Sequence, residues 1–201
     1  PVDDHPEAAP MTAIKIKLDL KPLGMALDFM SSQQRDFAMR DALNRAMDGM
    51  FTTAKRGIAK EANIAIGDIS RAMHKNPAQG GGLSAEVRVT DRWYPGGYRQ
   101  FGAKQGGSGT TFTPWKGHAE FVAHGFVATM KSGHRSVFVR VGKKRLPIGD
   151  VGWGPNPARE MVREDKPTHT EVMNIAQVRF QARFEYQYDR IVLQAKAKFG
   201  L

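Results

Sequence analysis

The sequence predicts an α+β fold: a long N-terminal helical segment, an antiparallel β-sheet or meander, and a long C-terminal helix. Apolar residues recur at helical spacing from Leu23 to about Asn63 and again over Thr168–Lys198. Between these segments, several short stretches alternate apolar and polar residues and are separated by glycine-rich turns, as is typical of strands. We expect about four to six strands, a usual sheet size, with the last helix packed on them.

Residues 1–22 are expected to form an N-terminal arm followed by a strand. Pro1–Pro10 is acidic and rich in proline, has no signal-peptide pattern, and is expected to be an adaptable arm. Ala13–Leu20 alternates apolar with charged residues, which predicts a half-exposed strand that ends before Pro22. We assign residues 23–201 to a single α+β domain.

The N-terminal helical segment has an apolar stripe and a natural break. Serine is a good helix cap, so Ser31-Ser32 can divide the segment into two helices. A short further helix is expected from Gly67-Asp68, with Ile69 and Met73 at i,i+4 spacing, and it ends before Gly80–Gly82. The stripe consists of Phe37, Leu43, Met47, Met50, Ala54 and Ile58.

The middle of the chain is expected to be a β region with basic turns. Strands are predicted over Leu83–Asp91, Thr111–Trp115 and Phe121–Ala128. Beyond them, Val137, Val139 and Val141 share one face of an extended chain. The turns Lys131–Arg135 and Val141–Arg145 then make a β-meander whose connections carry positive charge.

The C-terminal helix is predicted over Thr168–Lys198. Thr168 or Thr170 can cap its start, and Lys196 and Lys198 suit the negative end of its dipole. Its apolar stripe, expected to be core, consists of Val172, Ile175, Phe180, Phe184, Tyr188, Ile191 and Ala195.

Several short blocks carry a resemblance to a known family. They are Gly125–Met130, Gly133–Arg135, Val137–Arg140 and Arg145–Ile148, with Gln100–Gln105 upstream. In this order they resemble the bacteriophage minor tail protein Z family, over roughly Leu43 to the C-terminus. Gly154–Pro157 lies where the family has a Gly-Pro-Ser-Val-Pro-like segment, and Asn and Pro replace part of that segment here.

The resemblance implies a structural virion protein of a tailed phage. Such a minor tail protein is a tail-completion component at the head-proximal end of the tail, near the neck, and acts in head–tail joining. It is expected to form a ring oligomer, sixfold, around the DNA channel, with the tail terminator and connector as partners and non-specific contact with genomic DNA. It would be made in the host cytoplasm and reside in the virion.

The charge of the chain supplies an alternative function. The formal net charge is +10 and the sequence pI is near 10.0, which favours an anionic partner, nucleic acid first. Between residues 101 and 149 only Glu120 opposes eight Lys and Arg residues. The alternative is therefore a sequence-independent nucleic-acid-binding protein, although the basic turns can also be a solvated surface. Candidate DNA- or subunit-contacting residues are Lys131, Arg135, Arg140, Lys143, Lys144 and Arg145.

Four aromatic residues near a loop are candidate interface anchors, because aromatic side chains are enriched in interfaces. The same residues can equally belong to the core. They are Trp93, Tyr94, Tyr98 and Phe101.

The sequence predicts no enzyme, cofactor or membrane span. It has no cysteine, no apolar run of about 18–20 residues and no P-loop pattern. His118, Glu120 and His124 share parity on an extended chain, so a metal site, and with it a metal-dependent nuclease, is a weaker third possibility. His134 with Asp150 is a conceivable acid–base pair, but a solvated or phosphate-contacting His134 is the preferred interpretation.

Overall fold

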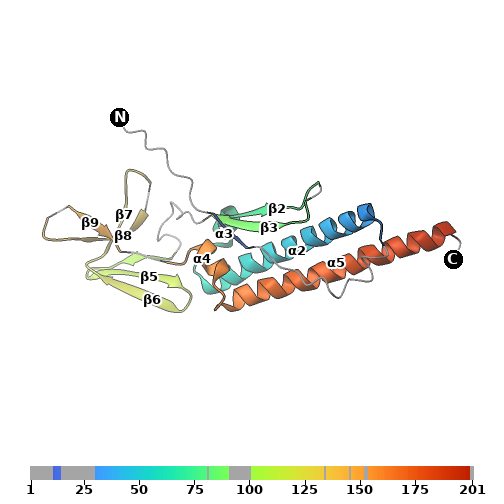
Figure 1. Cartoon of the computed structure of the whole chain (residues 1–201). Helices are drawn as coiled ribbons and strands as arrows, with labels where there is room; N and C mark the ends of the chain where they lie inside the picture. The colour runs from blue at the N-terminus through green and yellow to red at the C-terminus, as the bar shows by residue number, and fades with distance from the viewer. Residues whose placement is uncertain are drawn as a thin grey trace, which may run out of the picture. The chain divides into compact units, whose positions relative to one another are not determined.

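The computed structural model describes residues 11–14, 30–80, 82–90, 101–133, 135–144, 146–151 and 154–199. It confirms the α+β class, with a long N-terminal helix, a long C-terminal helix and antiparallel strands between them (Figure 1). The chain divides into two compact units where the sequence predicted a single domain from residue 23 onward. Unit 1 comprises residues 1–11, 55–72 and 90–161, and unit 2 comprises residues 12–54, 73–89 and 162–201.

Helix α2 (Ser32–Glu61) begins where the serine pair predicted a break. The Ser31 hydroxyl accepts a hydrogen bond from the Gln34 backbone N–H at 3.4 Å, and the Ser31 N–H donates to Gln34 Oε1 at 3.1 Å. This reciprocal pair is a capping box, which satisfies backbone donors at the helix start. The expected helical residues 23–29 lie outside the described residues.

In unit 2, α2 packs side by side with α5 (Pro167–Phe199), and the two run antiparallel (Figure 1). The bounds of α5 agree closely with the predicted helix. Of the predicted apolar stripe, Val172, Phe180 and Phe184 are fully buried, whereas Ile175, Tyr188, Ile191 and Ala195 are only half-buried. Phe180 and Phe184 stack at 6.2 Å between ring centroids.

The predicted stripe of α2 is partly wrong. Met47, Met50, Ala54 and Ile58 are buried, but Phe37 at its start is about half exposed. Small residues that the stripe did not include, Ala38, Ala42 and Ala46, are buried instead. Because alanine has no long side chain, these positions allow close approach of the packed neighbours without adding to an apolar pattern dominated by large residues.

A three-stranded sheet of order β1-β3-β2 belongs mainly to unit 2. Its strands are β1 (Met11–Ile14), β2 (Met73–Asn76) and β3 (Glu86–Thr90). The β2–β3 loop is tied to α2 by a reciprocal pair: Asn44 Oδ1 accepts from the Ala78 N–H at 2.8 Å, and Asn44 Nδ2 donates to the Ala78 carbonyl at 3.3 Å.

The prediction that Met73 continues a helix is wrong. Helix α3 (Ile66–Ala72) ends one residue earlier, and Met73 pairs with Val89 in the β2–β3 ladder. The Thr90 hydroxyl donates to the carbonyl of Ala72 at 2.9 Å, satisfying a helix-end acceptor. A long-range pairing thus overrides the i,i+4 apolar spacing.

Unit 1 contains two further three-stranded sheets, so the expected single sheet is wrong. One has the order β4-β5-β6 and the other β7-β8-β9. The first sheet consists of β4 (Lys104–Gln105), β5 (Gly109–Trp115) and β6 (His118–Ala123). The second consists of β7 (Phe126–Thr129), β8 (Arg135–Arg140) and β9 (Ile148–Asp150), followed by α4 (Pro157–Val162).

The expected strand over Phe121–Ala128 is in fact two strands in different sheets. Between β6 and β7, His124 adopts a left-handed backbone conformation with φ of 56°. The Thr110 hydroxyl, fully buried, donates to the Gly125 carbonyl at 2.8 Å and fixes this corner. Such a φ is unusual for a residue with a side chain, so alternation alone did not predict the break.

The β4-β5-β6 sheet of unit 1 is bonded to the end of α2 and to the residues just after it. The Asn63 amide donates to the Thr113 carbonyl at 2.9 Å, and Lys116 Nζ donates to the Ala59 carbonyl at 2.6 Å. Phe112, Val137 and Phe138 are buried in this unit. Within the described part of the chain, no helix combines the length and apolarity needed to cross a membrane.

Candidate basic interaction surface

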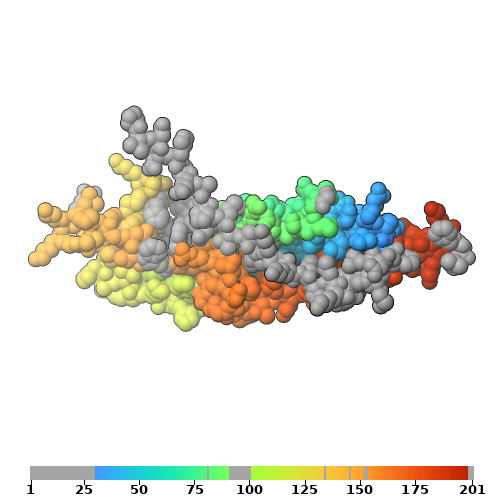
Figure 2. Space-filling model, viewed as in Figure 1, coloured from blue at the N-terminus to red at the C-terminus, as the bar shows by residue number. Residues whose placement is uncertain are grey.

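Two turns of the β7-β8-β9 sheet carry exposed positive charge. Lys131 lies in the β7–β8 turn, and Lys143 and Lys144 lie in the β8–β9 turn; all are exposed. Figure 2 shows both connections as projections from unit 1, in the yellow-orange part of the colour scale. We call Lys131, Arg135, Arg140, Lys143 and Lys144 the basic surface.

Strand β8 places the two arginines of this surface at its opposite ends. Arg135 pairs with Thr129 of β7, and Arg140 pairs with Ile148 of β9. Arg135 is half-buried and Arg140 is exposed. The strand therefore connects the two basic turns and holds an arginine at the base of each.

Arg140 is held by an aromatic ring that the sequence analysis did not single out. Its guanidinium carbon lies 5.6 Å from the centroid of the Phe126 ring, which itself lies 6.2 Å from the Phe138 ring. A cation over an aromatic face at this distance is stabilised by the ring quadrupole. The strand register explains this contact: Phe126 pairs directly with Phe138, which lies two residues before Arg140 in β8.

The charges of the basic surface lack carboxylate partners in the described part of the chain. Among the described residues, none of the five cations forms an ion pair. The adjacent carboxylate of Asp150 accepts a hydrogen bond from the Ser136 hydroxyl at 2.5 Å. The two turns lie at opposite ends of β8, so the cations form two separate groups. Because like charges repel, each group is stabilised when an anionic surface lies opposite it. Arg145 lies outside the described residues.

The aromatic interface candidates divide between the core and the undescribed part of the chain. Phe101 is only 4% exposed and packs against Gly154, so it belongs to the core, the alternative that the sequence left open. Its carbonyl accepts a hydrogen bond from the Thr113 N–H at 2.9 Å, which joins it to β5. Trp93, Tyr94 and Tyr98 lie outside the described residues.

The imagined metal and acid–base sites gain no geometric support. His118 and Glu120 are exposed on β6, while His124 follows the end of that strand. In the described residues, no group of at least three His, Cys, Asp or Glu side chains is placed to hold a metal ion. His134 lies outside the described residues, so its pairing with Asp150 stays untested.

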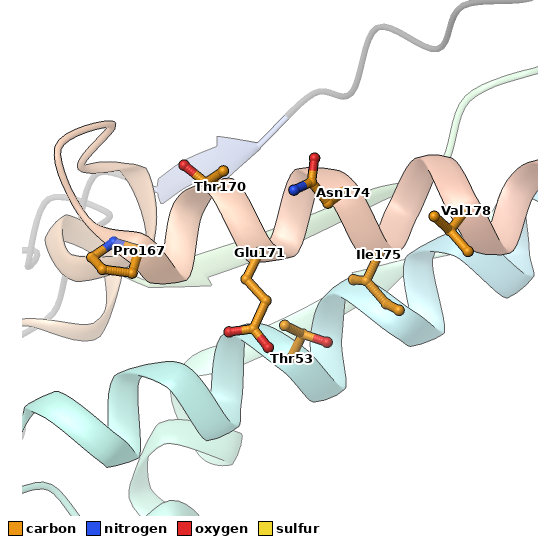
Figure 3. A pocket seen from close by; sticks show the side chains of 7 residues that line it. All are labelled: Thr53, Pro167, Thr170, Glu171, Asn174, Ile175 and Val178. Atoms are coloured by element: carbon orange, nitrogen blue, oxygen red, sulfur yellow. The ribbon is translucent and has the colours of Figure 1, made fainter.

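Unit 2 has an open groove between its two long helices. The groove has a volume of about 580 Å³ and is lined by Thr53 of α2 and by α5 residues from Pro167 to Val178. Figure 3 shows Glu171 extending from α5 toward Thr53. Of the side chains that line it, Glu171 alone ionises, so the groove offers neither a nucleophile with its base nor a pair of carboxylates.

Comparison with protein-family models, with curated proteins and with solved structures found no match for this chain. The described geometry is one of exposed cations on the turns of a β-sheet, a chemistry suited to an anionic macromolecular partner.

Proposed function

We propose that the chain is a structural virion protein of a tailed phage. In this proposal it is a tail-completion component at the head-proximal end of the tail and forms a ring around the DNA channel at the head–tail junction. The basic surface of the β7-β8-β9 sheet, whose cations form no ion pair with described residues, is the observation that carries the proposal, because cations can dock a neighbouring subunit or hold the DNA backbone without reading sequence.

The blocks that resemble the minor tail protein Z family support the same proposal. Gly125–Met130 contains β7, Val137–Arg140 lies within β8, and Arg145–Ile148 leads into β9. Blocks that are separate in the sequence therefore belong to one hydrogen-bonded sheet, the sheet that carries the basic turns. A shared structural element is what a common assembly role would require.

The mechanism is assembly rather than catalysis. A ring arises when one patch of a subunit binds a different patch of the next and the rotation closes on itself. Charges at such a seam set the docking register and the rate of association. Cations that face the channel would hold the DNA backbone without selecting bases.

The experiment replaces the charges of the β8–β9 turn in assembling tails. We expect Lys143→Ser/Lys144→Ser/Arg145→Ser to leave the fold intact and to lower the yield of joined, infectious particles when mutant tails are mixed with wild-type heads. The matched control is Arg45→Gln/Arg56→Gln/Lys60→Gln, which removes three charges at exposed positions of α2. Normal joining and infectivity of the turn variant at physiological salt would identify its charges as a solvated surface.

The net charge of +10 favours one alternative, a sequence-independent nucleic-acid-binding protein. Binding of that kind releases counterions, so its affinity for duplex DNA should fall steeply with salt concentration. Tight DNA binding by the isolated chain at physiological salt, together with normal head–tail joining by the turn variant, would favour this alternative over tail completion.

A further inference from the structure

The carboxylates of α5 all lie on one exposed face of the helix. The helix contains Glu171, Glu185 and Asp189 as its acidic residues, and all three are exposed. Glu171 and Asp189 are 18 residues apart, which is about five turns at 3.6 residues per turn, and Glu185 lies within about 40° of both. Over this stretch the acids therefore form one line along the helix.

Apolar side chains share this face. Val178 and Leu193 are 59% and 65% exposed, and Ala182 between them is also exposed. Within the described chain, none of the three carboxylates forms an ion pair. Lys196 is exposed seven residues after Asp189, on the same side of the helix, so the acidic stretch ends before it. We call Glu171, Val178, Glu185, Asp189 and Leu193 the acidic face of α5.

The β8–β9 turn of unit 1 has the complementary chemistry. It presents Lys143 and Lys144 between two exposed apolar side chains, Val141 at 65% and Leu146 at 67% exposed. A net basic protein thus has one surface of cations mixed with apolar groups and another of carboxylates mixed with apolar groups. Each supplies what the other lacks, since interfaces combine charge complementarity with buried apolar contact.

We propose that the β8–β9 turn of one copy docks on the acidic face of α5 of the next copy. The inference rests on the proposed ring, because it names the two different patches that a closed ring requires. DNA is the less favoured occupant of this turn: phosphates would satisfy the lysines but leave Val141 and Leu146 in water. The acidic face would repel DNA, so its charge favours a protein partner over DNA.

Reversing the charges of the two surfaces in separate variants tests whether they contact each other, because surfaces that do not meet would not compensate for each other in a mixture. The charge-reversed turn variant, Lys143→Glu/Lys144→Glu, has acidic residues on both surfaces. The face variant, Glu185→Lys/Asp189→Lys, has basic residues on both. Each variant alone should self-associate about tenfold more weakly than the wild type, because like charges across a seam are costly. In an equimolar mixture each turn finds an opposite face, so association should return.

Sedimentation velocity at low salt, over a range of concentrations, measures this directly. Asp36→Lys/Glu120→Lys is the control for the face variant, because it makes the same charge change at exposed acids of α2 and β6 and should associate like the wild type. Circular dichroism checks that every variant is folded. The proposal is supported if each variant by itself associates weakly and the equimolar mixture associates like the wild type.

Three results would overturn the inference. They are a wild-type chain that stays monomeric at the highest concentration, reversed variants that associate normally, or a mixture that stays dissociated. The failure of the inference is distinguishable from that of the proposed function. If Lys143→Ser/Lys144→Ser/Arg145→Ser loses head–tail joining while self-association does not return in the mixture, the tail role stands and the turn binds another partner.

Discussion

Asp41 on α2 accepts a hydrogen bond from Arg183 on α5, with Arg183 Nε 2.5 Å from Asp41 Oδ2. The same carboxylate oxygen accepts from the Gln187 amide at 2.6 Å. The bond to Asp41 raises the pKa of the Arg183 guanidinium, so this arginine stays charged throughout the working pH range. One acid thus links two successive turns of α5 to α2 and fixes how the helices are aligned.

Removing this acid should destabilise unit 2 through Gln187 more than through the ion pair. Gln187 is only 2% exposed, so Asp41→Ala leaves its buried amide without that acceptor, at a cost of about 1–3 kcal/mol. Asp36→Ala, at an exposed position of the same helix, should change stability by about 0.5 kcal/mol or less. Urea unfolding followed by circular dichroism compares them, and equal midpoints would remove Asp41 from the account of helix alignment.

Phe184 should be a core residue whose truncation is expensive. It is fully buried and stacks on Phe180, so Phe184→Ala should cost about 3–5 kcal/mol in the free energy of unfolding. Val178→Ala on the exposed face of α5 is the control and should cost about 0.5 kcal/mol or less. A Phe184 variant that keeps full stability but no longer assembles would instead place this ring in an interface.

A methyl group at position 154 should destabilise unit 1. A Cβ added to Gly154 would overlap the ring of Phe101, which is buried and cannot move freely, so Gly154→Ala should cost about 1–3 kcal/mol. Gly107→Ala is the control, because its Cβ would meet nothing within 4 Å. Thermal unfolding of both variants tests whether Phe101 is fixed in the core; indistinguishable melting temperatures would show that it is not.

The carboxyl group of Asp165 should titrate below its ordinary range. A hydrogen bond from Arg163, together with its positive charge, lowers the pKa of Asp165. A lowered folded pKa means that the pair contributes stability above the unfolded pKa, about 3.9, and loses it as pH falls through the folded value. Carboxyl NMR titration should show the low midpoint in the wild type and a return toward normal in Arg163→Gln; the same midpoint in both proteins would contradict this cause.

The helices could be predicted from the sequence because helical periodicity is a local signal. The serine break before α2 followed from capping residues, and the extent of α5 followed from apolar spacing. The expected cap of α5 at Thr168 or Thr170 was wrong, because the helix begins before both, at Pro167. The sheets could not, since alternation shows that a segment is extended and does not show which strand it pairs with. Met73 and the corner at His124 were missed for that reason: a partner strand decided the first, and an unusual φ decided the second.

The candidate site was predictable in composition but not in context. The basic turns followed from the lysines and arginines between residues 131 and 145. That Arg140 lies over Phe126 depended on the register of β7 and β8. The spacings of 14 and 18 residues from Glu171 place the acids of α5 on one side of the helix. Only the structure shows that this side is exposed.

The central claim is the place of this protein in a virion, and electron microscopy of assembled phage particles tests it most directly. Particles carrying the chain with a small tag, decorated with a tag-specific label and averaged in three dimensions, show where it lies. We predict a ring of this chain at the head-proximal end of the tail, around the DNA channel. Purified infectious particles that lack the chain, or that carry it only elsewhere, would contradict the account.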